Sequence, residues 1–325
     1  MIVPEYWAEA RRHGRHAGHR VTVRRFGWSD EGQAQAQAHA EARVQEAFDA
    51  VLAGESRPLR ERLTNYGFNG VPIREEIVER VGDAVITRNS YGALCLNTPD
   101  VLFADVDFEP RPSGCALSLV AGAAVWGAAF VVGIAFVDPL PAALAAFVAL
   151  FLANAVSLAV RRRAFARGGG PEGGALARIE AFAQAHPDWH LRVYRTPAGL
   201  RVLVLHRTFS PCEPDVALLF QALQADRLYS SLCRLQHCFR ARVSPKPWRI
   251  GIVEHIRPRS AAWSREHARL PERLAWIDAY ARRSQGFAAC RYLRTLGDAA
   301  IDPKAGRVMD LHDALARAHA PLPLA

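Results

Sequence analysis

Residues 115–137 read CALSLVAGAAVWGAAFVVGIAFV and residues 139–160 read PLPAALAAFVALFLANAVSLAV, with Asp138 as the only charge in the whole stretch. A helix needs about 20 apolar residues to cross the hydrocarbon core of a bilayer, and both stretches reach that length. The Asp-Pro-Leu-Pro segment that joins them suits a tight turn. A pair of buried helices in a soluble core is the alternative, but such helices seldom stay apolar on every face. We therefore expect a two-helix transmembrane hairpin over 115–160.

The charges that flank this hairpin predict its orientation. Arg161, Arg162 and Arg163 follow the second stretch directly, Arg111 precedes the first, and the turn between them contains no Lys or Arg. Because positively charged flanks stay in the cytoplasm, the turn is expected outside and both flanking parts inside. The six cysteines then lie in a reducing compartment. The sequence therefore predicts an integral protein of the inner (cytoplasmic) membrane, with the lipid bilayer as a partner and anionic lipid headgroups beside the basic flanks.

The rest of the chain is predicted to form an α+β domain that the hairpin interrupts. The chain has 325 residues, 50% of them hydrophobic, and a formal charge of +9, which fits a folded basic protein. The expected parts besides the hairpin are a basic, frayed or partly helical segment over 1–20, a first cytoplasmic part over 21–114, a basic Gly-rich flexible linker over 161–175 and a second cytoplasmic part over 176–325 with a helical C-terminal region.

The periodicity and the turn residues predict individual elements. Strands are expected over 21–26, 101–108, 190–195 and 200–206, and two more within 83–96 that meet at Tyr91-Gly92. Helices are expected over 33–52, 176–186, 216–239 and 274–284, and a strand–turn–strand near 302–306. This order of elements indicates one sheet that is built by segments from both sides of the hairpin.

Asp105 and Asp107 are the sharpest chemical signal in the sequence. Residues two apart in a strand share a face, so the two carboxylates point the same way, about 7 Å apart. Two like charges there repel unless a cation or an arginine offsets them, and carboxylates at this spacing suit divalent cations. A solvated strand end is the alternative reading, but the other residues of 101–108 are apolar. We therefore treat the pair as a candidate Mg²⁺ or Mn²⁺ site.

A second motif, Arg-Thr-Pro-Ala-Gly-Leu-Arg at 195–201, complements the acidic pair. Its turn brings the guanidinium groups of Arg195 and Arg201 near each other, and the backbone N–H groups around Gly199 can approach an anion closely. Carboxylates that hold a metal and arginines that hold phosphate are the groups that nucleoside triphosphate chemistry requires.

Taken together, these motifs resemble the catalytic core of the archaeo-eukaryotic primase superfamily, and its bacterial primase–polymerases in particular. The matching pieces are Phe-Ala-Asp-Val-Asp at 103–107 and Tyr-Arg-Thr-Pro-Ala-Gly-Leu-Arg at 194–201, within regions 83–110 and 175–210. The resemblance implies an RRM-like or ferredoxin-like mixed sheet, catalytic carboxylates at Asp105 and Asp107 that bind Mg²⁺ or Mn²⁺, and nucleotide phosphate at Arg195, Gly199 and Arg201.

Two positions depart from the family pattern. The family places a phosphate-contacting histidine just after the glycine turn, where this chain has Val202, and His206 is the nearest histidine. We keep His206 as a phosphate-binding candidate. The family's third acid has no evident match, and Asp215, Asp226 and Asp310 are the alternatives.

Further basic and sulfur-containing residues lie downstream of these motifs. Basic side chains recur over 234–259 with Phe239 and Trp248 among them, a mixture that suits nucleic acid, anionic lipid or a plain solvated face. Cys233 and His237 would share one face of a helix and could hold zinc. No Cys-x-x-Cys pair accompanies them, and zinc is therefore not expected.

Two functions are open on this reading. The first is a membrane-anchored cytoplasmic binding or scaffold module, in which Asp105 and Asp107 are ordinary polar residues. The alternative is a metal-dependent nucleotide or nucleic-acid enzyme of primase–polymerase-like descent, in which both are essential. A Walker loop and a Gly-x-Ser-x-Gly elbow are absent from the sequence, which removes the enzyme classes that depend on them.

Overall fold

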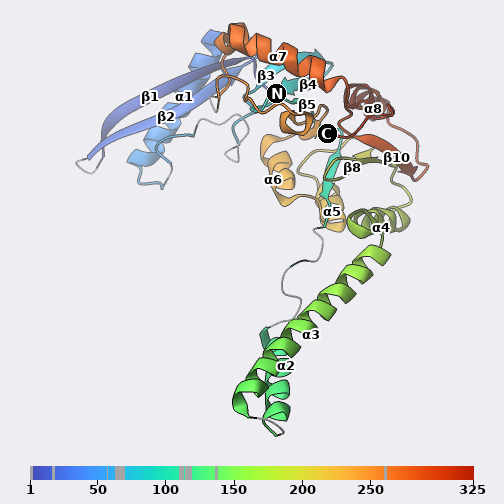
Figure 1. Cartoon of the computed structure of the whole chain (residues 1–325). Coiled ribbons are helices and arrows are strands. Elements are labelled where there is room, and N and C mark those ends of the chain that lie inside the picture. The colour runs from blue at the N-terminus through green and yellow to red at the C-terminus, as the bar shows by residue number, and fades with distance from the viewer. Residues whose placement is uncertain are drawn as a thin grey trace.

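The chain folds as an α+β protein with three antiparallel sheets and a pair of long helices that extends away from them (Figure 1). The computed structural model describes residues 3–16, 19–56, 58–62, 70–109, 113, 119–135, 138–259 and 262–325. The fold class predicted from the sequence is confirmed at this level, whereas the predicted mixed sheet is wrong, since every strand pairing is antiparallel.

The main sheet joins the two parts of the sequence that flank the hairpin. Its strand order is β10-β7-β8-β6. The strands are β6 (Phe103–Asp107), β7 (Leu191–Arg195), β8 (Gly199–Val204) and β10 (Arg291–Leu296). Strand β6 precedes the hairpin and pairs with β8, which follows it, and β7 continues the sheet on the other side of β8. Burial of Phe103, Leu203 and Val202 on this sheet supplies much of its core.

A second sheet also pairs a strand that precedes the two long helices with a strand that follows them. Its order is β3-β4-β5-β9, and its strands are β3 (Glu76–Val81), β4 (Ala84–Arg88), β5 (Leu94–Thr98) and β9 (Phe239–Arg242). Strand β9 belongs to the second half of the chain and pairs with β5 of the first half. Tyr229 links the two sheets: its hydroxyl donates a hydrogen bond to the backbone oxygen of Phe103 in β6 and accepts one from the backbone N–H of Arg240 in β9.

The helices between and after these strands differ in places from the prediction. They are α4 (Gly170–Ala185), α5 (Pro214–Leu223), α6 (Arg227–Gln236), α7 (Pro271–Ser284) and α8 (Pro303–Ala316). The region 216–239 is two helices and a strand, because the chain leaves α5 through Gln224 in the left-handed conformation. The predicted strand–turn–strand near 302–306 is wrong: Asp302 accepts hydrogen bonds from the backbone of Lys304 and Ala305 and caps α8.

Only one helix in the described part of the chain is long and apolar enough to cross a membrane, namely α3 (Pro139–Arg167). Its partner α2 (Leu119–Ile134) has 16 residues, fewer than a full span needs, and part of the predicted span over 115–137 lies outside the described residues. The sequence predicts two spanning helices, and the described residues contain one candidate span, α3. The helices pack through small residues, since a β-carbon at Gly133 would lie 2.9 Å from that of Ala142.

The predicted flexible linker over 161–175 is also wrong. Helix α3 continues through the arginines to Arg167, and α4 begins at Gly170. The short break between the two helices contains Gly169 in the left-handed conformation, which glycine adopts without steric cost.

The basic N-terminal segment is a strand rather than a frayed or partly helical end. Strands β1 (Tyr6–His16) and β2 (His19–Ser29) form a separate two-stranded sheet that packs on α1 (Gln33–Leu52), the helix predicted over 33–52. Ala8, Ala10 and Val23 form a small core with the alanines of α1. Gly27 permits this close packing, because a β-carbon there would lie 2.2 Å from the backbone nitrogen of Ala40.

Candidate functional site

The register of β6 and β8 places Asp105 directly opposite Arg201. Directly opposed residues of an antiparallel pair share a face, so the two side chains meet. Nε of Arg201 donates to Oδ1 of Asp105 over 2.8 Å, and Nη2 donates to Oδ2 over 3.2 Å. The Arg201 side chain is 3% exposed and that of Asp105 is 35% exposed. The predicted metal ligand and the predicted phosphate ligand therefore neutralise each other across the sheet.

A buried hydrogen-bond network with His312 and Asp313 holds the Arg201 side chain in this position. Its Nη1 donates to the backbone oxygen of Arg242 over 2.9 Å and lies 3.4 Å from Nε2 of His312. The other ring nitrogen of His312 lies 3.0 Å from Oδ1 of Asp313, which also accepts a hydrogen bond from Arg192. Burial lowers the pKa of His312, so the neutral ring can accept from Arg201. Burial also disfavours the charge on Arg201, but Asp105 outweighs that effect, and the pKa of Arg201 is raised.

Asp107 lies beside this pair with a free face toward solvent. Partial burial raises its pKa, and the negative charges of Asp226 and Asp105 raise it further. Asp226 is the N-cap of α6, where its side chain accepts from the backbone N–H of Leu228. Of the three alternatives for a third acid, Asp226 is thus the one that the fold brings to the pair. A cluster of this kind attracts a cation.

Asp105, Asp107 and Asp226 line one cleft of about 530 Å³ at the junction of the two larger sheets. The prediction that Asp105 and Asp107 face the same way is confirmed. Thr196 and Ala198 of the β7–β8 turn also line this cleft. The same cleft is also lined by basic side chains from β9 and from the segment that follows it, namely Arg240, Arg242, Lys246 and Arg249.

Three of these basic side chains crowd one another. Lys246 has its pKa lowered by partial burial and by the positive charges of Arg242 and Arg249, although Asp107 and Asp105 oppose the shift. Partial burial and Arg242 lower the pKa of Arg249 in the same way. Within the described residues, no carboxylate lies within ion-pair distance of any of the three, and Nη1 of Arg249 is buried without a hydrogen-bond partner. We call Arg242, Lys246 and Arg249 the cationic wall.

Arg240 differs from the cationic wall because it has a partner inside the protein. Its Nη2 donates to both carboxylate oxygens of Glu75, over 2.9 and 2.7 Å, and both side chains are nearly buried. Thr87 donates a further hydrogen bond to Glu75. This pair therefore supports the floor of the cleft and adds no net charge to it.

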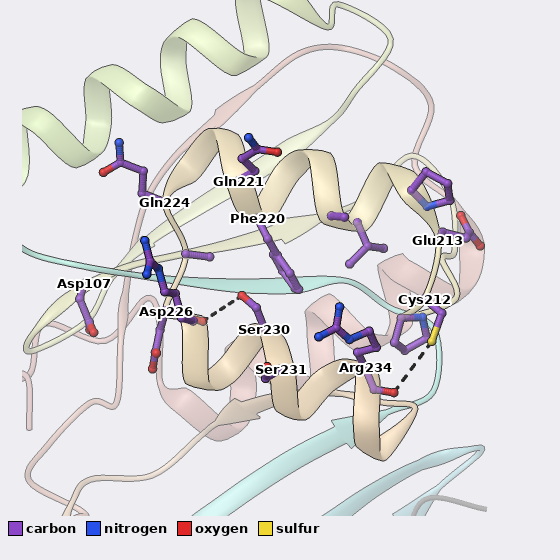
Figure 2. Close-up of a pocket in the computed structure, with 16 residues that line it drawn as sticks. Asp107, Cys212, Glu213, Phe220, Gln221, Gln224, Asp226, Ser230, Ser231 and Arg234 are labelled. Carbon is purple, nitrogen blue, oxygen red and sulfur yellow. Dashed lines mark hydrogen bonds between the residues drawn. The ribbon is translucent and has the colours of Figure 1, made fainter. Parts of the chain in front are cut away.

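A second and larger pocket, of about 760 Å³, adjoins the cleft between α5 and α6. Figure 2 shows Asp107 and Asp226 at one end of this pocket and Cys212 and Arg234 at the other, with Phe220 and Ser230 between them. Asp107 and Asp226 are the residues that line both cavities. The two acids therefore stand where the two cavities meet.

The other predicted phosphate ligands lie elsewhere. Arg195 is about half exposed and pairs with Glu172 of α4, over 3.3 Å. Gly199 is buried against β6, where a β-carbon would lie 2.2 Å from the backbone oxygen of Val106, so it permits strand pairing. His206 packs its ring against Trp189 and Phe209, outside the cleft. The cleft thus does not include these three.

The suggested zinc residues do not form a common site. Helix α6 ends at Gln236, so His237 leaves the helical face on which Cys233 is buried. His237 instead lies near Cys212, with 3.9 Å between Nδ1 and Sγ. In the described ranges, no group of three His, Cys, Asp or Glu side chains is arranged to hold a metal ion by itself.

The sequence shows the basic residues of 234–259 but does not predict that they lie near Asp105 and Asp107. The observation that could have marked Arg249 and Lys246 is their density beside Trp248, which itself packs edge-on against Tyr91 at the rim of the cleft. Their assignment to the cleft depends on how β9 joins β5. Comparisons of this chain with protein-family models, curated proteins and solved structures find no match.

Proposed function

We propose that the protein is a membrane-anchored cytoplasmic protein whose cleft binds a nucleoside polyphosphate together with a divalent cation. The observation that carries this proposal is the cationic wall, which faces Asp107 and Asp226 and lacks an acidic partner in the described residues. Crowded cations with an unpaired buried donor favour a bound polyanion, because it would offset their mutual repulsion. A triphosphate is such a ligand, and Trp248 and Tyr91 offer aromatic surface for its base.

The acids fit a divalent cation only with help from the ligand. Asp105 already has both oxygens bound to Arg201, and the described chain offers no three-ligand group. Mg²⁺ is commonly held by one or two carboxylates and by substrate phosphates, with water in the remaining positions. Asp107 and Asp226 would be those carboxylates. When bound, the metal would neutralise phosphate charge, and the cationic wall would orient the phosphates.

The same geometry supports descent from a primase–polymerase-like core. Strands β6 and β7 both run antiparallel to β8, which lies between them, so β6, the intervening helices, β7 and β8 form a split βαβ unit of the kind found in RRM-like and ferredoxin-like sheets. The strand that ends in the acidic pair and the strand that follows the Thr-Pro-Ala-Gly turn are neighbours in it.

The membrane part of the proposal is that the chain crosses the bilayer twice. Helix α3 has the length for one crossing. Because β6 and β8 pair in one sheet, the chain must return to the side from which it left, and α2 lies antiparallel along α3 in Figure 1. The apolar residues around α2 would complete the second crossing. By the positive-inside rule, Arg161, Arg162 and Arg163 favour the cytoplasmic side of the inner membrane for the sheets, next to anionic headgroups.

A second candidate function, a binding or scaffold module without chemistry, is favoured by one specific contact. The bidentate pair of Asp105 with Arg201 leaves one predicted catalytic carboxylate neutralised. In this alternative the cleft binds a phosphorylated ligand through the cationic wall alone, and no metal is needed.

Isothermal titration of the purified protein in neutral detergent separates the two candidates. ATP is titrated with Mn²⁺ and with EDTA, into wild type, Asp107→Asn and Arg249→Gln. Metal-dependent ATP binding that both variants weaken supports the nucleotide proposal. Binding that is equal in EDTA and insensitive to Asp107→Asn supports the scaffold module.

The controls Asp278→Asn and Arg282→Gln change exposed residues of α7 with the same charge differences. Absence of ATP binding, or binding that Arg249→Gln leaves intact, contradicts both candidates at this cleft.

A further inference from the structure

The β1–β2 hairpin presents arginines on the face that does not pack on α1. Residues 8, 10 and 14 of β1 face α1, since Ala8 and Ala10 belong to its core and a β-carbon at Gly14 would lie 2.3 Å from the ring of Phe48. Side chains alternate along a strand, so the odd-numbered residues of β1 point the other way. The outer face thus carries the cross-strand pairs Arg11 with Arg24, His13 with Thr22, and Arg15 with Arg20.

The outer face is positively charged toward its Arg15–Arg20 end, whereas Trp7, Trp28 and Phe26 lie toward its other end. Glu9 is the only acidic residue in the two strands, and it pairs with Arg11 over 2.5 Å. Arg15 and Arg20 are exposed, and within the described residues neither forms an ion pair. Like charges directly opposite each other in an antiparallel pair destabilise it. Glu9 offsets the charge of Arg11, whereas the Arg15–Arg20 pair retains this repulsion, which a bound polyanion would relieve.

We infer that the outer face of the β1–β2 ribbon binds the phosphate backbone of a nucleic-acid duplex. A two-stranded ribbon has the width that the major groove of a duplex admits. Cross-strand pairs on one face recur about every 7 Å, close to the spacing of every second phosphate along a strand. In Figure 1 the ribbon extends beyond the other sheets, where a duplex has access to it. This inference does not depend on the nucleotide cleft.

An anionic membrane surface is the less suitable partner for this face. Interfacial binding buries apolar side chains beside the cations. Toward its closed end the ribbon exposes His13, Thr22, Arg15 and Arg20, and its small-residue face is covered by α1. His13 and Thr22 are joined by a contact of 2.9 Å between Nδ1 and Oγ1, which keeps polar groups between the arginine pairs. This end of the outer face therefore offers charge and hydrogen bonds without apolar side chains.

Fluorescence anisotropy with a labelled duplex of about 20 base pairs tests the inference on the full chain in phosphatidylcholine nanodiscs. We expect Arg15→Gln with Arg20→Gln to weaken binding at least 10-fold near 0.1 M salt and to reduce the slope of log K against log salt by about 2, since each lost phosphate contact removes about 0.9. The matched control is Arg269→Gln with Arg282→Gln, which removes the same charge from exposed positions outside the ribbon.

Equal losses in the two double variants would show that only net charge matters and would overturn the inference. It would also be overturned if phosphatidylglycerol vesicles displaced the labelled duplex better than unlabelled duplex at equal phosphate concentration, since that result assigns the ribbon to the membrane surface. Circular dichroism of both variants checks that the fold is retained. ATP titration on the ribbon variant is expected to be unchanged, which keeps this test separate from that of the cleft.

Discussion

Asp105 and Arg201 are 96 positions apart in the chain, yet they stand opposite each other in the sheet and share two hydrogen bonds. The pair joins the segment before helices α2 and α3 to the segment after them. It also decides which carboxylate of the acidic motif is available, because Asp105 is bound within the protein whereas Asp107 faces the cleft.

The two partners of this pair should differ in their contribution to stability. Asp105→Asn leaves the guanidinium of Arg201 buried without a countercharge, and we expect a loss of about 3–5 kcal/mol. Arg201→Gln leaves Asp105 partly in contact with water, so the expected loss is smaller, about 2 kcal/mol. Denaturant unfolding of the detergent-solubilised variants measures both. Equal losses would contradict the unequal burial of the two side chains.

Asp107 should make metal binding depend on pH. Its pKa is raised above 3.8 by partial burial and by Asp226 and Asp105, and Mn²⁺ requires the charged form. We expect Mn²⁺ affinity in the presence of ATP to fall as pH decreases through this raised pKa, at a higher pH than an ordinary aspartate would give. In Asp107→Asn the remaining binding should lose most of this dependence. An unchanged pH profile in that variant would assign the dependence to another group.

Arg249 should strengthen ATP binding while it lowers the stability of the free protein. Its unpaired buried Nη1 costs stability, so Arg249→Met is expected to raise the free energy of unfolding by about 1 kcal/mol. The same change removes a phosphate contact and should weaken ATP binding about 10-fold, which corresponds to about 1.4 kcal/mol. Unfolding and titration of the same preparation test the two effects. A variant that is both less stable and fully able to bind ATP would refute this role.

Asp313 should contribute stability at neutral pH that is lost in acid. Hydrogen bonds from His312, Tyr194 and Arg192 outweigh its burial and lower the pKa of its carboxyl. A lowered pKa stabilises the fold above the ordinary value of 3.8, and that stability is lost as pH falls through the folded-state value. We expect Asp313→Asn to cost about 2–4 kcal/mol at pH 7 and less below pH 4. Thermal unfolding at both pH values measures this; a constant difference would contradict it.

The proposed topology predicts which thiols an impermeant reagent reaches. Asp138 lies between the two membrane helices, so Asp138→Cys should be labelled in intact cells. Cys212 is the exposed cysteine on the sheet side and should be labelled only after permeabilisation. Labelling of Cys212 from outside would reverse the orientation.

The parts of the fold that follow from local periodicity were predictable, and those that depend on long-range register were not. Two-residue alternation correctly placed Asp105 and Asp107 on one face. The pairing of Asp105 with Arg201 depends on the register of β6 against β8, and a shift of one residue would have separated them. Lys246 and Arg249 reach the cleft only because β9 joins the second sheet at β5.

The second strand of the N-terminal ribbon contains the strand predicted over 21–26, whereas its first strand, β1, was missed for a different reason. Its inner face consists of small residues such as Ala8, Ala10 and Gly14, whose low hydrophobicity hides the alternation that usually marks a strand. The arginines and histidines between them dominate the composition and suggest a solvated segment. The inner face of the strand is buried by its contact with α1, and this contact cannot be read from the sequence of the strand alone.

The insertion of α2 and α3 between β6 and β8 sets an order of events during synthesis. The ribosome completes β6 first, then the two membrane helices, and only afterwards the strand that must pair with β6. The edge of β6 therefore stays open in the nascent chain until β8 has been made. Under the topology proposed above, α2 and α3 must enter the bilayer and the chain must return to the cytoplasm before the two strands can pair, so that errors of membrane insertion would lead to misfolding of the sheet.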